Sequence, residues 1–465
     1  MGAACAAAAS ARSWLVTALG VAALILALVP ASRVGFDASV EGWFLPNDTT
    51  LERYQESRER FGHDEFLLVV LEPARGDVFQ NEVLVPLSQL AARLDADSLV
   101  TRVHGIHNAV VIQAVADTIR VEPALGELPL EAEALDRARA DLLSDPRAAG
   151  FLVAPDAAHA VLVVDLEAAG LPDRLAFAER VEHLAGEYRS ASLRIHVMGD
   201  VVLHRDLYLK VQRDMRWVLP LLALMLVVVL GVAFRSPLAV VLCLGVVGTS
   251  VVGARALMAA LGWGDSPLLT LVPVVLVVTG VADAVHVLDR YLHARGADTE
   301  PAEAMRSVLR ELFRPCLFTS LTTAAGFLAL TASQLFPLRQ LGVLAATGVG
   351  VAFVYSMLVL PAAVVAFRLR GHTEGTAVAR VLRHLPSWIE RRRRWVLAGC
   401  VLLTLLGLVG MLRLQVESRY LETFHAKDPV RQEAEWVEAN AGGLASLEVL
   451  VASEVPGGVL EPAAL

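Results

Sequence analysis

The sequence predicts a membrane protein, mainly an α-helical transmembrane bundle of about seven helices, with a large α+β domain outside the bilayer. Of its 465 residues, 55% are hydrophobic and 19% are charged, and the mean hydropathy is +0.56. Globular proteins average roughly 45–50% apolar and about 25% charged residues, so a bilayer must cover the apolar excess. The hydrophobicity excludes a disordered chain, and the net charge of −9 argues against a nucleic-acid partner.

Seven apolar runs are long enough for helices that cross a hydrocarbon core of roughly 30 Å. We expect these spans at residues 13–30, 217–234, 237–261, 267–288, 315–332, 338–367 and 394–412. A cleaved signal peptide is the alternative for the first run, which follows Arg12 and ends in small residues. The length of that run, and the return of a similar run at Trp395, favour an uncleaved helix.

The placement of arginine predicts the orientation of these spans. The connections at 289–314 and 368–393 are rich in arginine, whereas the alternate short connections contain none. Because short loops rich in Lys and Arg stay in the cytoplasm, we expect residues 1–12 and the linker 368–393 to be cytoplasmic. The long segment 31–216 then lies outside.

That outer segment alternates strand-like and helix-like patterns. FLLVVLE from Phe66 and HAVLVVDLEA from His159 indicate strands, whereas VLVPLSQLAARLDA from Val83 and PDRLAFAERVEHLAGEYR indicate helices. The order is close to βαβ repeated twice, which predicts two small split-βαβ subdomains in an α+β domain.

The region after the first apolar run reappears after the seventh, at a constant offset of 380 residues. The matching pairs are Phe44 with Phe424, Asp48 with Asp428, Gly62 with Gly442, Leu67 with Leu447 and Val69 with Val449. Chance identity is the alternative, but helix, acidic segment and strand recur in the same order. We therefore expect residues 413–465 to begin a second, incomplete outer domain, so that a missing half or a partner subunit supplies the rest.

The fourth span carries a polar stripe inside the membrane. Thr279, Asp283, His286 and Arg290 follow one another at spacings of four, three and four residues, which places them on one helical face. Charged groups are costly at this depth, and a low dielectric disfavours an ionised carboxylate. We expect Asp283 and His286 to relay protons, with Thr279 and Arg290 as support; static pairing of Asp283 with His286 or Arg290 is the alternative.

Hydroxyl side chains gather in the fifth span at Thr319, Ser320, Thr322 and Thr323. They are expected to support the relay by hydrogen bonding to Asp283. Ordinary helix packing explains such residues equally well.

Other chemistry has no motif in the chain. Phosphate-binding glycine loops, nucleophile elbows and H-E-x-x-H are absent from the sequence. His104 and His107 are spaced H-x-x-H, but in a strand-like context they do not converge on a metal. We expect no enzyme activity, no metal and no cofactor.

Several stretches resemble the resistance-nodulation-division (RND) superfamily, particularly its MMPL-type branch. They are GVADAVHVLDRY from Gly280, RPCLFTSLTTAAGFLAL from Arg314 and DMRWVLPLLALMLVVVLGVAFRSPLAVVL from Asp214. The resemblance implies twelve helices, two large porter-like periplasmic domains and a sterol-sensing-like unit at 217–367. It also implies export of lipids or other hydrophobic molecules from a bacterial inner membrane, driven by the proton gradient.

The same resemblance places Asp283 at the acidic position of the fourth helix. Many relatives carry paired acids or an Asp-Tyr there, whereas this chain has Ala282 and Ala284 on either side of Asp283. The tenth helix, which holds the relay's partner groups in the family, lies beyond these residues, so helices eight to twelve must come from the missing half or a partner. A periplasmic partner is a further expectation. A lipid-binding or lipid-sensing module and an accessory to protein secretion are the alternative functions.

Overall fold

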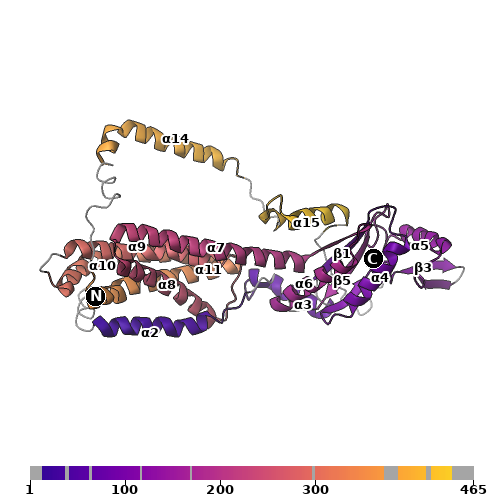
Figure 1. The fold of residues 1–465 in the computed structure, drawn as a ribbon, viewed down its shortest axis with the longest axis horizontal. Coiled ribbons are helices and arrows are strands. Elements are labelled where there is room, and N and C mark those ends of the chain that lie inside the picture. The colour runs from indigo at the N-terminus through magenta and orange to yellow at the C-terminus, as the bar shows by residue number, and fades with distance from the viewer. Residues whose placement is uncertain are drawn as a thin grey trace. The chain divides into compact units, whose positions relative to one another are not determined.

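The computed structural model describes residues 13–36, 41–61, 65–115, 118–167, 170–295, 299–370, 386–414, 420–441 and 443. The chain divides into two compact units. We call residues 1–52 and 209–416 the helical unit, and residues 53–208 and 417–465 the sheet unit. Figure 1 shows the elements of both.

Among the residues that the structure describes, seven helical stretches are long and apolar enough to cross a membrane, in agreement with the number predicted. They are α2 (Ser13–Ala31), α7 (Asp200–Phe234), α8 (Pro237–Ala260), α9 (Leu271–Ala294), α10 (Pro301–Leu328) with η2 (Ala329–Ala332), α11 (Phe336–Val354) with η3 (Tyr355–Val359) and α12 (Leu360–Ala366), and α14 (Arg393–Met411). Two of them begin earlier than predicted. Polar turns precede the apolar runs of α7 and α10, and hydropathy alone does not detect helical turns of that kind.

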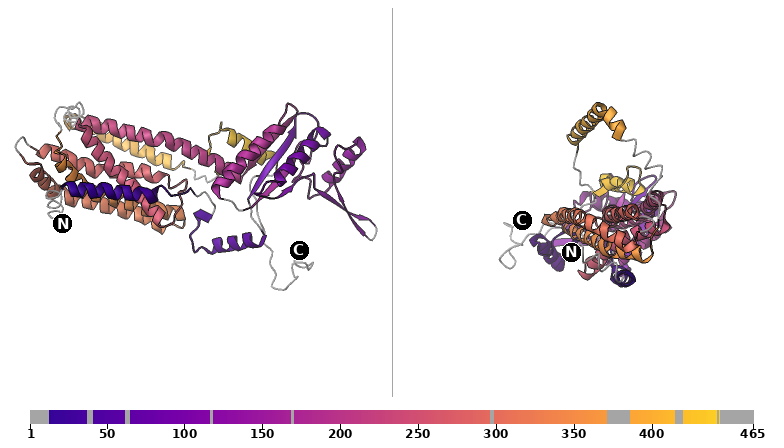
Figure 2. Two further views of the ribbon diagram at one scale, coloured as in Figure 1. Left: turned by 60° about the horizontal axis from the view of Figure 1, so that its bottom comes forward. Right: turned by 90° about the vertical axis from the view of Figure 1, so that its left-hand side faces the viewer.

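Helices α8, α9, α10 and α11 pack side by side as a bundle, as Figure 2 shows. On α9 the buried positions Val272, Leu276, Gly280, Ala284 and Val287 recur at helical spacing. This periodicity places one continuous stripe of α9 against its neighbours. Gly280 lies close to both α8 and α11, since an added Cβ would be 3.4 Å from Ser250 Oγ and 3.5 Å from Ala352 Cβ. Small residues therefore set the spacing in this part of the bundle.

The sheet unit contains one four-stranded antiparallel sheet in the order β2-β5-β1-β6. Its strands are β1 (Phe66–Pro73), β2 (Val100–His104), β5 (Ala160–Leu166) and β6 (Leu193–Gly199). The helices of this unit include α3 (Thr49–Phe61), whose first residues belong to the helical unit, α4 (Asn81–Asp95), α5 (Ala132–Ser144) and α6 (Leu171–Tyr188).

This topology corrects the prediction of two subdomains. The units β1-α4-β2 and β5-α6-β6 interleave, because β5 and β6 both pair with β1. They share one core, in which β1 is buried from Leu67 to Leu71. In the sequence, the antiparallel pair β3 (Val110–Val115) and β4 (Thr118–Pro123) lies between the units β1-α4-β2 and β5-α6-β6. Sequence patterns identify strands and helices, but they do not determine which strands share a sheet.

The repeat is visible in the order of elements. Helix α14 begins and ends 380 residues after α2, and α15 (Pro429–Asn440) begins 380 residues after α3. In the sequence, the short helix η1 (Glu41–Trp43) lies between α2 and α3, and the short helix η4 (Tyr420–Thr423) lies between α14 and α15.

The placement of α15 differs from what the repeat predicts. We expected residues 413–465 to begin a second outer domain, yet Ala434 and Val437 of α15 belong to the core that contains the β1–β6 sheet. Helix α15 contacts β6 directly. The apolar face of this helix explains the difference, because it finds a partner on the sheet of the first domain.

Candidate functional site

Asp283 lies on α9 beside the buried stripe of that helix. The preceding turn contributes the buried Gly280 and the next residue is the buried Ala284, whereas Asp283 itself is half-buried. Because Asp283 is one position away from the buried stripe, its carboxylate lies at the edge of the α9 interface. An ionisable group within a span of this hydropathy is a candidate functional site.

A side chain of α10 contacts this carboxylate directly. Ser320 Oγ donates a hydrogen bond to Asp283 Oδ2 across 2.9 Å. One turn earlier on α10, the buried thiol of Cys316 also interacts with Asp283. Serine and cysteine four residues apart share one face of a helix, so α10 presents two donors to the carboxylate. The sequence predicted Ser320 and missed Cys316, although the spacing of Cys316 from Ser320 was available as a signal.

The other predicted hydroxyls bond to the backbone of their own helices. Thr279 donates to the carbonyl of Val275, and Thr319 donates to the carbonyls of Pro315 and Cys316. Thr322 likewise bonds the carbonyls of Phe318 and Thr319. Threonine in helices often satisfies its hydroxyl in this way. Thr323 is half-buried, and the structure gives its hydroxyl no hydrogen bond to the described residues.

The charged end of the predicted stripe lies outside this site. Arg290 pairs with Glu311 of α10, with Arg290 Nη2 at 2.6 Å from Glu311 Oε1. This pairing corrects the expectation that Arg290 supports Asp283. His286 is exposed, and within the described part of the chain its ring makes no polar contact with Asp283. The structure therefore brings Asp283, Ser320 and Cys316 together, with His286 one turn away on the same helix.

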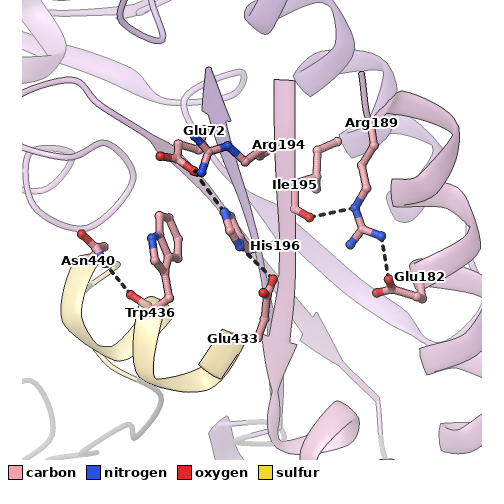
Figure 3. A network of polar contacts seen from close by, with 9 residues as sticks. All are labelled: Glu72, Glu182, Arg189, Arg194, Ile195, His196, Glu433, Trp436 and Asn440. Atoms are coloured by element: carbon pink, nitrogen blue, oxygen red, sulfur yellow. Dashed lines mark hydrogen bonds and ion pairs between the residues drawn. The ribbon is translucent and has the colours of Figure 1, made fainter. Parts of the chain in front are cut away.

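A second polar cluster lies in the sheet unit, around His196 of β6 (Figure 3). His196 Nδ1 lies 2.8 Å from Glu433 Oε1 of α15, and Nε2 lies 3.3 Å from Glu72 Oε2 of β1. The ring stacks on Trp436 of α15, with 3.8 Å between ring centroids. Arg194 also contacts Glu72, at 3.3 Å. These contacts hold α15 against β6, an edge strand of the sheet.

The two carboxylates set the charge of His196. Burial disfavours the imidazolium, but the hydrogen bonds and charges of Glu433 and Glu72 outweigh burial and raise the pKa of His196 above its ordinary value. A cavity of about 550 Å³ lies beside the cluster, and its walls include Arg189, Arg194 and Val430. The sequence missed this cluster because 237 residues separate His196 from Glu433.

Among the described residues, no group of three or more His, Cys, Asp or Glu side chains could hold a metal ion. The arrangement at Asp283 places an ionisable carboxylate within hydrogen-bond distance of a hydroxyl on the neighbouring helix. The arrangement at His196 is suited to holding two segments together.

Parts of the chain are similar to known proteins. The model of the MMPL family matches residues 78–398. Similar curated proteins include the probable transport protein MmpL8 of Mycobacterium bovis and the sulfolipid-1 exporter MmpL8 of Mycobacterium tuberculosis. Each is 27% identical over 252 residues, which are 52% of this chain and 23% of the relative. The match thus spans about a quarter of the relatives' length.

Proposed function

Because the chain belongs to the MMPL family, we propose that it takes part in exporting a lipid or another hydrophobic molecule, driven by proton influx at Asp283. Similarity to proteins named as a transport protein and a sulfolipid-1 exporter supports the transport of lipids. The proposed role is transport, with no chemical conversion of the molecule and no cofactor besides the proton gradient.

The observation that carries this proposal is the hydrogen bond from Ser320 to Asp283. An ionised carboxylate in a low dielectric is stabilised by donors, and Ser320 and Cys316 supply them. A protonated Asp283 no longer requires two donors, because one of its oxygens now carries a hydrogen. Protonation of Asp283 therefore changes the free energy of the contact between α9 and α10. A proton, like any ligand, shifts the equilibrium between two conformations only if it binds one of them more tightly than the other.

His286 is the proposed route between Asp283 and the aqueous side. It is exposed at the next turn of α9 toward the arginine-rich connection. Histidine is the side chain whose ordinary titration lies near neutral pH, so it passes protons readily. Thr323 is a supporting candidate, because its half-buried hydroxyl is placed three residues after Ser320.

The proposed setting is a bacterial inner membrane with several spans. The arginine-rich connections support a cytoplasmic N-terminus and a periplasmic sheet unit.

Asp283→Asn in the native gene tests the proposal. Cells are labelled with [14C]acetate, and the lipids on the cell surface are compared with those retained inside. We expect Asp283→Asn to retain the same lipid as a deletion strain, and a protonophore to reproduce this effect in the wild type. Asp289→Asn is the matched control, because Asp289 is exposed on the same helix and pairs with His293.

Export by Asp283→Asn at the wild-type rate would contradict the proton relay. If the variant and the deletion strain both left every surface lipid unchanged, the exporter would be excluded. A lipid-binding module would then be the better account.

A further inference from the structure

A groove opens in the helical unit where α2 and α8 end. It has a volume of about 360 Å³ and is lined by residues within 30–35, at and after the end of α2, and within 259–264, at and after the end of α8. We call this cavity the exit groove. Its walls combine polar and apolar surface, and the apolar part includes Pro30 and Val34 from the α2 side and Trp263 from the α8 side.

Two hydrogen bonds to backbone carbonyls of the α2 side hold the two walls of the exit groove together, and an ion pair orients the Arg255 side chain that makes one of them. Arg255 Nη1 of α8 lies 3.0 Å from Asp265 Oδ2, and Arg255 Nε contacts the carbonyl oxygen of Ala31 at 3.5 Å. The backbone N–H of Asp265 donates to the carbonyl of Gly35 across 2.7 Å. The Trp263 ring is positioned by an edge contact with Phe336, with 5.8 Å between centroids. The groove is therefore built by packed elements on both sides.

Arg33 gives the exit groove a net positive charge. The negative charge of Asp265 is already matched by Arg255. Arg33 is exposed and lines the groove, and its guanidinium has no ionic or hydrogen-bond partner among the residues that the structure describes. An uncompensated cation beside a partly apolar cavity favours a ligand that carries an anion next to alkyl groups.

The position of Arg33 along the chain narrows the class of ligand. Arg33 follows the 19-residue apolar helix α2 by two residues. A basic residue just past the end of a spanning helix lies at the level of the lipid headgroups. A guanidinium at that level forms charge-assisted, often bidentate hydrogen bonds with a phosphate group.

We propose that the exit groove binds the anionic headgroup of a membrane phospholipid. The guanidinium of Arg33 contacts the phosphate, and Trp263 packs against the adjoining glycerol and acyl chain. This site lies at the rim of the helical unit, on helices other than α9 and α10. It therefore stands independently of the proton-driven export proposed for Asp283.

The repeat supplies a matched control for this site. Arg413 follows α14 as Arg33 follows α2, and the two backbones agree: Arg33 N bonds to Pro30 O and Arg413 N to Gly410 O, both at 3.0 Å. However, α14 buries none of its residues, whereas α8 packs beside α2. The two arginines share charge and local geometry, but among the described residues α2 packs against α8 whereas α14 is not packed against another helix.

Native mass spectrometry of the full chain with dioleoyl-phosphatidylglycerol and dioleoyl-phosphatidylcholine tests the proposal. We expect Arg33→Gln to reduce the retained phosphatidylglycerol by about fivefold, with phosphatidylcholine unchanged. Arg413→Gln should retain wild-type levels of phosphatidylglycerol. Ala260→Phe, which fills the exit groove and keeps Arg33, should lose phosphatidylglycerol as Arg33→Gln does.

Three results would overturn the proposal. Equal losses in Arg33→Gln and Arg413→Gln would show that any cation at a helix end attracts the lipid. Full retention by Arg33→Gln would remove the assigned contact. Displacement of the lipid by millimolar inorganic phosphate would show that the groove holds a free anion instead of a lipid headgroup.

Discussion

Ser320 of α10 donates a hydrogen bond to Asp283 of α9, with 2.9 Å between Oγ and Oδ2. Its neighbours Thr319 and Thr322 direct their hydroxyls to carbonyl groups of α10 itself. One hydroxyl in this cluster thus joins the two helices, and it does so at an ionisable group. In the proposed relay, this bond couples the packing of α9 against α10 to the protonation of Asp283.

Ser320→Ala is expected to slow export by about tenfold. Hydrogen bonds to charged groups contribute about 1.5–3 kcal/mol, and about 1.4 kcal/mol corresponds to tenfold in rate. Thr322→Ala is the control, because its hydroxyl contacts α10 carbonyls alone. Lipid export in [14C]acetate-labelled cells measures both variants. Equal rates for Ser320→Ala and Thr322→Ala would remove Ser320 from the relay.

Arg290→Gln is expected to leave export unchanged. Its guanidinium bonds Glu311, so its loss does not alter the donors that face Asp283. Exposed ion pairs of this kind contribute little to stability. Surface lipid in the labelled cells is again the readout. A loss of export as large as that of Asp283→Asn would show that Arg290 does support the function of Asp283.

The helices and the position of Asp283 could be predicted because both follow from local patterns. Apolar length predicts a span, and spacing along one helix predicts a shared face. The contacts of Asp283 depend on a second helix, and spacing along α9 cannot show whether Arg290 or Ser320 is closer. For the same reason the sequence did not predict that α15 packs on β6, because that contact joins residues more than two hundred positions apart.

The cluster around His196 predicts a pH-dependent stability. Folding raises the pKa of His196, since Glu433 and Glu72 favour its charged form more than burial opposes it. The cluster therefore stabilises the fold fully below the ordinary pKa of 6.5, and this contribution is lost as pH rises through the raised pKa. We expect the Tm difference between wild type and His196→Gln to be largest at acidic pH and to shrink on the alkaline side.

His183→Gln is the control for this experiment, because the side chain of His183 is 81% exposed on α6. Its Tm should follow the wild type at every pH. A difference between wild type and His196→Gln that stays constant with pH would contradict the assigned charge of His196.

Close packing around Gly342 of α11 predicts a selective effect of adding one methyl group. A Cβ at Gly342 would lie 2.5 Å from the carbonyl oxygen of Phe327, whereas a Cβ at Gly350 of the same helix would meet nothing within 4 Å. Overpacking costs about 1–3 kcal/mol, so Gly342→Ala should lower the Tm. Gly350→Ala should leave it equal or slightly higher, because alanine favours helix. Equal Tm values for the two variants would contradict this packing.

The most direct test of the central claim is infrared difference spectroscopy of the full chain in membranes, between neutral and mildly acidic buffer. If Asp283 takes up a proton, the wild type shows a carboxylic acid carbonyl band that shifts in D₂O and is absent from Asp283→Asn. Identical difference spectra for the wild type and Asp283→Asn would show that Asp283 does not exchange a proton, and would contradict the relay.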